Sequence, residues 1–145
     1  MDTRIDAATG PQTTIITVRA LVDPVVDELG FGPTSRYVET GWLGILGPTA
    51  TWAYRRIGSL AEVHPEGAEV DLADLALSLG LGEGMGKNSL MARALARLVN
   101  FEVARWEGEV LVVRRRLPPL PERRVARLSA SAARAHAHLT GRPRH

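Results

Sequence analysis

The chain of 145 residues contains no cysteine. This absence excludes a disulfide framework and any metal site built on thiolates. The chain also has no apolar run of 18 residues and no charged segment that leads into an apolar signal-type stretch. We therefore expect a soluble, cytoplasmic protein with no membrane contact. Apolar residues make up 45% of the chain, which is typical of one folded domain with extensions.

Lysine is almost missing, because 17 of the 18 basic residues are arginine and Lys87 is the exception. The planar guanidinium fork of arginine fits phosphate groups and guanine edges. The net charge is only +2 but is unevenly distributed. Residues 1–80 hold 11 acids and 5 bases, whereas residues 81–145 hold 5 acids and 13 bases. This asymmetry favours a nucleic-acid partner for the C-terminal half, and the alternative is a set of solvated arginine-rich faces.

The N-terminal third shows short elements rather than one long pattern. Residues 1–12 are polar and patternless, so we expect a flexible tail. Residues 13–46 are interpreted as an N-terminal helical extension that begins with a short, β-branched strand-like stretch. Within it, Asp23 is expected to cap a short helix that ends at Gly30.

Residues 47–116 show the order of elements of a winged helix-turn-helix domain. A helix begins after Gly47, a short extended piece follows, and Asp71 caps a second helix that stops at Gly80. A further helix covers residues 88–100, and a hairpin follows with a turn at Glu107–Gly108. The expected fold is therefore mainly α, with a small three-stranded sheet made of the extended piece and the hairpin, and with extra helices at both ends.

The glycine-rich stretch between the second and third helices, "GLGEGMGKNSL", resembles a phosphate-binding loop at first sight. A phosphate loop needs glycine five residues before Gly86 and serine or threonine after Lys87, but Leu81 and Asn88 occupy these places. The dinucleotide pattern fails as well, because Met85 stands at its third glycine site. We therefore interpret the stretch as a turn, with Gly80 in a left-handed conformation and Asn88 as the cap of the next helix.

The helix over residues 88–100 has two distinct faces. Its inner face is formed by apolar residues, namely Leu90, Met91, Ala94, Leu95, Leu98 and, just beyond the helix, Phe101. Its outer face combines small residues with Ser89, Arg93 and Asn100. A major groove accepts such a helix, so we predict that Arg93 contacts a base edge, with Ser89 and Asn100 in secondary roles. Lys87, Arg97 and the backbone N–H groups near Asn88 are expected at phosphates.

The hairpin is a less favourable DNA contact than the helix, since its tip carries Glu107 and Glu109. Arg105 and the run Arg114–Arg116 are predicted to reach the phosphate backbone from the base of the hairpin. Alternation along a strand would turn Arg115 away from its two neighbours, so the three cannot all serve one surface.

Residues 117–145 are interpreted as a proline-rich bracket followed by one last helix that ends at Gly141. Its arginines are expected to help hold phosphates. A narrow apolar stripe on this helix suits either a homodimer contact or packing on the chain's own core. Residues 24–46 are a second place where a homodimer could form.

His136 and His138 are two residues apart on a helix and cannot chelate one metal. No nucleophile motif is present, so we expect no enzyme activity, no metal and no cofactor.

Two long segments, "SRYVETGWLGILGPTATWAYRRI" and "LGLGEGMGKNSLMARALARLVNFEVAR" followed by "VRRRLPPLP", carry a resemblance. They resemble a set of small, uncharacterised actinobacterial proteins with a winged helix-turn-helix-like domain, over about residues 24–140. The resemblance implies a type of source organism and little about function.

Together these features predict a sequence-specific protein that binds double-stranded DNA, a transcriptional regulator that reads the major groove with helix 88–100 as a dimer. Such a protein would be associated with the nucleoid. The alternative is a winged-helix module for protein–protein interaction without DNA binding.

Overall fold

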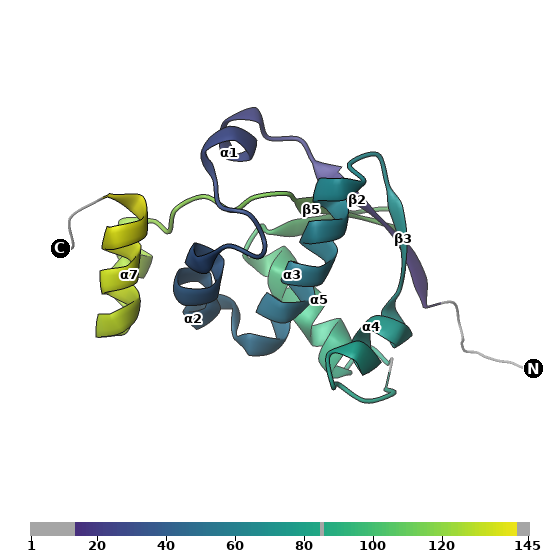
Figure 1. The fold of residues 1–145 in the computed structure, drawn as a ribbon. Coiled ribbons are helices and arrows are strands. Elements are labelled where there is room, and N and C mark those ends of the chain that lie inside the picture. The colour runs from purple at the N-terminus through teal and green to yellow at the C-terminus, as the bar shows by residue number, and fades with distance from the viewer. Residues whose placement is uncertain (1–13, 85, 142–145) are drawn as a thin grey trace, which may run out of the picture.

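The structure is a computed structural model that describes residues 14–84 and 86–141. The tail expected at residues 1–12 lies outside this part of the chain. In chain order the elements are β2 (Ile15–Leu21), α1 (Pro24–Leu29), the π-helical turn η1 (Val38–Trp42), α2 (Leu43–Leu46), α3 (Pro48–Val63), β3 (Ala68–Asp71), α4 (Leu72–Ser78), α5 (Leu90–Asn100), β4 (Ala104–Glu107), β5 (Val110–Arg114), α6 (Glu122–Val125) and α7 (Ala130–Thr140) (Figure 1).

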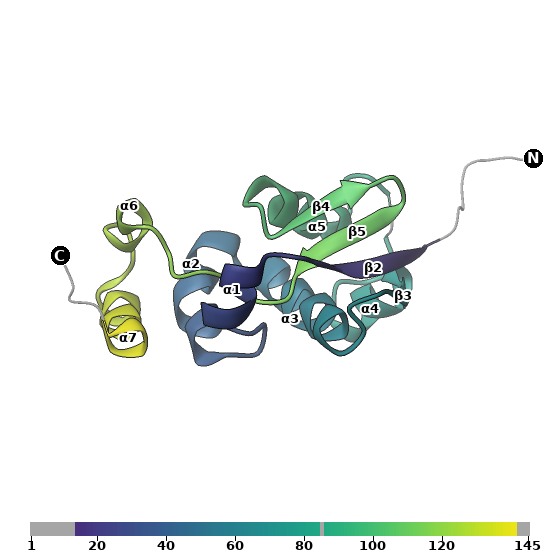
Figure 2. The same cartoon turned by 90° about the horizontal axis from the view of Figure 1, so that it is seen from above.

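Within the described residues, four strands form one mixed sheet in the order β3-β2-β5-β4 (Figure 2). The expectation of a mainly α fold with a three-stranded sheet is therefore wrong, and the protein is α/β. The difference lies in β2, which pairs in parallel with β5 and antiparallel with β3. Its β-branched residues suit a central strand, and this strand separates β3 from the hairpin that β3 was expected to join.

The two longest helices of the sheet layer, α3 and α5, pack on each other and on one face of the sheet (Figures 1 and 2). Tyr54, Ile57 and Leu98 from these helices meet Val18 and Leu111 from the central strands, and all five are fully buried. Because side chains alternate along a strand, the neighbours of the core residues point to the opposite face of the sheet. The sheet is thus covered by helices on one side, and its other side carries Arg19 and Arg105.

The hairpin turn consists of Gly108–Glu109, one residue later than predicted, since Glu107 pairs with Val110. Gly108 has a φ of +61°, which only glycine adopts without strain at the first position of a type II′ turn. The predicted left-handed Gly80 is confirmed by a φ of +76°. These turns fix where α4 ends and where β5 begins.

The predicted single C-terminal helix is wrong, because it is divided into α6 and α7. The hydroxyl of Ser129 accepts a hydrogen bond from the N–H of Ala132 at 3.1 Å and thereby starts a new helix. This helix ends at Gly141, as predicted, with a φ of +69°. The division turns α7 back toward η1, against which it packs. Figure 2 shows α6 and α7 together at one end of the molecule.

Buried aromatic side chains hold this C-terminal segment. The hydroxyl of Tyr37 accepts a hydrogen bond from Leu120 N–H at 2.8 Å and lies 2.7 Å from Nδ1 of the buried His136. Trp42 Nε1 donates to the carbonyl of Pro118 at 3.0 Å. Residues 117–120 are therefore an ordered segment that connects the sheet to α6 and α7.

Candidate nucleic-acid interface

Helix α5 is the central element of the predicted DNA-binding surface. Ser89, and not the predicted Asn88, caps it, because the Ser89 hydroxyl accepts a hydrogen bond from Ala92 N–H at 3.1 Å. Its apolar residues Met91, Ala94, Leu95 and Leu98 are buried, which confirms the predicted inner face. Leu90 was predicted on the same face but is 45% exposed, since the helix has only begun at this residue.

The exposed face of α5 consists of Arg93, Ala96, Arg97 and Asn100. The helix contains no acidic residue. Ser89 is half-buried and already engaged as a cap, so its hydroxyl is less accessible than the prediction assumed. Lys87 and Asn88 are exposed in the preceding loop. Arg93, Arg97 and Asn100 therefore lie on one side of α5, and Lys87 is exposed in the loop that leads into the helix.

Structural elements flank the exposed face of α5 on both sides. On one side, α5 and the start of α3 with its cap Gly47 enclose a shallow hollow of about 390 Å³ that Arg93 and Arg97 line. On the other side, Trp106 of β4 lies beside Ala92 and Ala96 and is 44% exposed. The small side chains of α5 thus lie between Trp106 on one side and the start of α3 on the other.

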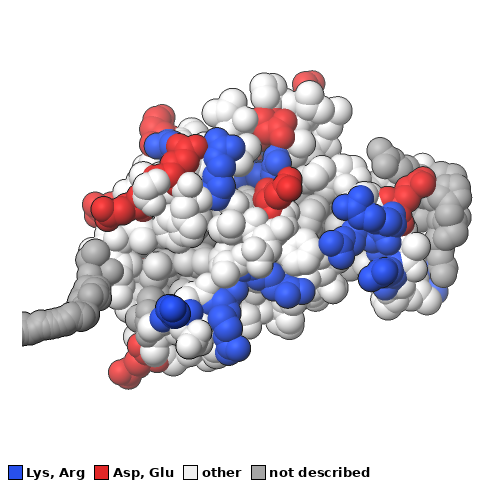
Figure 3. Space-filling model, turned by 180° about the vertical axis from the view of Figure 1, so that it is seen from behind, with Lys and Arg blue, Asp and Glu red and all other residues white. Residues whose placement is uncertain are grey.

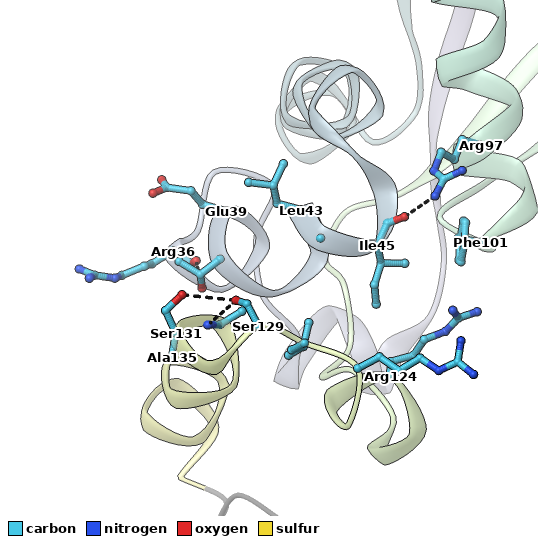
Figure 4. A pocket seen from close by; sticks show the side chains of 15 residues that line it. Arg36, Glu39, Leu43, Ile45, Arg97, Phe101, Arg124, Ser129, Ser131 and Ala135 are labelled. Carbon is cyan, nitrogen blue, oxygen red and sulfur yellow. Dashed lines mark hydrogen bonds between the residues drawn. The ribbon is translucent and has the colours of Figure 1, made fainter.

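The C-terminal end of α5 leads into a groove of about 710 Å³ between α2 and α6–α7 (Figure 4). Arg97 reaches across it and donates a hydrogen bond from Nη2 to the carbonyl of Ile45 at 2.7 Å. The guanidinium groups of Arg97 and Arg124 each lie 5.2 Å from the ring centre of Phe101. The aromatic ring thereby brings two positive charges close together without an acid between them.

Four arginines line this groove, namely Arg36, Arg97, Arg124 and Arg127, against a single acid, Glu39. Figure 4 shows Arg36 and Glu39 pointing outward at one end and Arg124 at the other. Within residues 14–84 and 86–141, no acid forms an ion pair with any of the four arginines. Their charges are therefore available to an external anion. Arg36 was absent from the predicted site, and Arg124 and Arg127 were expected at phosphates only as unnamed arginines of the last helix, since no local motif links them to α5.

The predicted backbone contacts Arg114–Arg116 have a different environment. Arg114 binds Asp23 at 2.8 Å, Arg115 binds Asp27 at 2.9 Å and Arg116 binds Glu62 at 3.2 Å. The first two arginines both reach α1, so the predicted strand alternation does not hold beyond the end of β5 at Arg114. The hydrogen bond from Arg114 is the main cause that lowers the pKa of Asp23 below its ordinary value of 3.8. These three charges hold α1 and α3 against the sheet.

Arg105 also lies away from α5. It is aligned with Val112 of β5 and, through it, with Arg19 of β2, on the sheet face opposite the helices. Glu107 accepts hydrogen bonds from Arg19 at 2.6 Å and from Arg105 at 3.0 Å. The Glu107 carboxylate thus offsets one of the two positive charges of Arg19 and Arg105, and Arg105 lies on the sheet face opposite the helices.

Figure 3 shows how the charged side chains are distributed over one face of the molecule. In Figure 3, groups of basic side chains lie along the lower edge of the molecule and at its α6–α7 end. Most acidic side chains on this face are gathered toward the top, against basic ones. We call the exposed residues Lys87, Arg93, Arg97 and Asn100, together with Arg124 and Arg127, the basic face.

Other kinds of site find no support among the described residues. They contain no cluster of three histidine, aspartate or glutamate side chains that would hold a metal ion. His136 is buried against Tyr37, and His138 is exposed on a different side of α7. None of the described helices is long and apolar enough to cross a membrane. Comparison with known proteins finds no matching family model, no matching curated protein and no matching solved structure.

Proposed function

We propose that the chain binds double-stranded DNA through the basic face and acts as a transcriptional regulator. The observation that carries the proposal is the exposed, acid-free side of α5, which continues into the arginine-lined groove at α6. Phosphate contacts supply most of the affinity of a DNA-binding protein, and they need several unpaired cations on one surface. The basic face offers such cations.

Arg93 is the base-reading residue of the proposal. It lies near the middle of the exposed face, next to the small residue Ala96, and forms no ion pair within the described part of the chain. Small neighbours permit a helix to approach the base edges closely, and an arginine fork fits the O6 and N7 atoms of guanine. Asn100 lies two turns further along and is suited to an adenine edge.

Lys87, Arg97, Arg124 and Arg127 are assigned to phosphates. The hydrogen bond to Ile45 and the contact with Phe101 hold Arg97 in place, which suits a contact that fixes position rather than sequence. The proposal leaves out Arg105 and Arg114–Arg116, because acids of the same chain already neutralise them.

A fluorescence-anisotropy titration tests the proposal, with labelled GC-rich duplexes of different sequence at several salt concentrations. Arg93→Ala should weaken binding to the preferred duplex by about 1–3 kcal/mol and reduce the difference between duplexes. Arg19→Ala, which removes the same charge from the opposite face of the sheet, should leave binding unchanged. If the wild type does not bind at low salt, or if both variants behave alike, DNA binding by this face is ruled out.

A further inference from the structure

A separate hollow lies on a different side of the molecule, between α3 on one wall and β3 with α4 on the other. Its volume is about 590 Å³, and it shares no lining residue with the hollows beside α5. Figure 1 shows α3, β3 and α4 on the viewer's side, whereas the basic groups of Figure 3 are seen from behind. This hollow is therefore separate from the arginine-lined groove of the basic face.

Large apolar side chains of this hollow are open to solvent. Trp52 is 50% exposed and Val63 is 70% exposed, and both belong to the α3 wall. They are eleven residues apart, which places them on one side of the helix about three turns from each other. Leu60, Val70 and Leu75 also line the hollow. An open apolar surface of this kind suits a protein partner better than an enclosed small molecule.

The two walls of the hollow carry opposite charges. The α3 wall holds Arg55 and Arg56, and the opposite wall holds Glu69 and Asp74. Within the described residues, no ion pair joins these walls. The guanidinium of Arg55 lies 4.9 Å from the ring centre of Trp52.

Two N–H donors of the Arg55 side chain lack a hydrogen-bond acceptor among the described residues. Its Nε and Nη1 atoms are buried and have no hydrogen-bond acceptor. Both atoms are covered by the chain itself, so the charge that Arg55 offers to a partner is limited to the rest of its guanidinium.

We propose that this surface, defined by Trp52, Arg55, Arg56, Val63, Glu69 and Asp74, is the contact between two copies of the chain. A two-fold axis brings the same patch of both copies together. Such an axis would place the basic α3 wall of one copy against the acidic β3–α4 wall of the other, twice. A partner of uniform charge, such as DNA or an acidic peptide, would be repelled by one of the walls.

This contact differs from the homodimer contacts expected from the sequence, at the C-terminal helix or residues 24–46. In α7, Ala133 and His136 are buried within their own chain. Tryptophan and arginine are enriched among the residues that dominate binding energy at protein interfaces, and the exposed Trp52 and Arg56 supply both. The inference does not depend on DNA binding and is tested without DNA.

Variants with exchanged charges provide the sharpest test of this dimer contact. The mass of each variant in solution is measured by light scattering after size-exclusion chromatography over a range of protein concentrations. The wild type should be a dimer. Arg56→Glu and Asp74→Arg, each purified alone, should be mainly monomeric, because like charges then meet at the axis. An equimolar mixture of the two variants should recover the dimer, because each introduced charge meets its opposite across the axis.

Two tryptophan variants supply the matched control. Trp52→Ala should prevent dimerisation, whereas Trp106→Ala, which truncates the other half-exposed tryptophan beside α5, should not. Circular dichroism of every variant verifies that the fold is kept. A monomeric wild type at all concentrations, a dimer that survives Trp52→Ala, or a mixture that fails to recover the dimer would overturn the proposed contact.

Discussion

At the scale of single residues, the conformation of Glu102 is unusual. It is the one non-glycine residue with positive φ among residues 14–84 and 86–141, at +62°, and it follows the end of α5. Val103 N–H bonds to Leu98 C=O at 2.9 Å across this residue, as in the usual left-handed helix ending. The Glu102 carbonyl accepts a hydrogen bond from Arg114 at 2.8 Å, which ties the end of α5 to β5.

We therefore predict that Glu102→Gly stabilises the protein by about 1 kcal/mol, because glycine adopts this conformation without the steric cost that a Cβ imposes. Urea unfolding measures the change. Glu109→Gly removes the same charge from a turn position without positive φ and should give no such gain. Equal effects of the two changes would refute the explanation.

A second prediction at this scale concerns acid stability. The pKa of Asp23 is lowered chiefly by the hydrogen bond from Arg114, and that of Asp71 chiefly by the hydrogen bond from Thr14. A lowered pKa in the folded state means that the unfolded state binds more protons near the ordinary value of 3.8. The stabilisation is thus complete above this value and is lost as the pH falls below it.

The free energy of unfolding of the wild type should therefore decrease when the pH is lowered through this range, and Asp23→Asn should show a smaller decrease. Denaturation series at several pH values measure both slopes. Glu28→Gln is the control, since Glu28 is an exposed acid of the same helix and forms no ion pair within the described residues. An unchanged slope in Asp23→Asn would contradict the assignment.

At the scale of elements, the attachment of α7 depends on a few buried groups. Tyr37 contacts both the segment 117–120 and His136, and its hydroxyl accepts a hydrogen bond from the buried N–H of Leu120. One wall of the arginine-lined groove therefore depends on a residue that is far from the groove in the sequence.

Tyr37→Phe should destabilise the protein by about 1–3 kcal/mol, because the N–H of Leu120 would remain buried without an acceptor. Hydrogen exchange should also become faster in α7 than in α5. Tyr54→Phe removes another tyrosine hydrogen bond, from its hydroxyl to Arg114 C=O at 2.9 Å, and should leave α7 protected. Equal exchange in α7 for both variants would refute the attachment.

At the scale of the whole molecule, the arginines are divided between two tasks. Those at the end of β5 and on the outer face of the sheet bind acids of the same chain, whereas Arg93, Arg97, Arg124 and Arg127 form no ion pair with the described residues. The net charge of +2 therefore understates the positive charge of the basic face. Long-range attraction of DNA should follow the free arginines alone.

The double variant Arg124→Ala/Arg127→Ala should reduce the slope of log affinity against log salt by about 1.8, or about 0.9 for each lost phosphate contact. The double variant Arg19→Ala/Arg105→Ala removes the same charge from the outer face of the sheet and should leave the slope unchanged. Anisotropy titrations at several salt concentrations give both slopes. Equal slopes for the two double variants would contradict the assignment of phosphates to α6.

The sequence by itself determined the local features of this protein. Asp23 and Asp71 cap helices, Gly80 ends a helical segment with positive φ, and the inner face of α5 is largely the predicted one. Each of these depends on neighbours within about four residues, so a short window contains the necessary information. Where the cap moved from Asn88 to Ser89, the error was a single residue.

Only the tertiary structure decided the strand order and which arginines are free. Arg114 meets Asp23 across 91 residues of chain, and Arg116 meets Glu62 across 54. β2 enters the sheet beside a strand that follows it by about ninety residues, as the pairing of Val18 with Leu111 shows. Such contacts depend on how distant segments pack and not on local pattern. For this reason the local pattern could not show that Arg114–Arg116 are paired with acids, whereas Arg93, Arg97, Arg124 and Arg127 form no ion pair within residues 14–84 and 86–141.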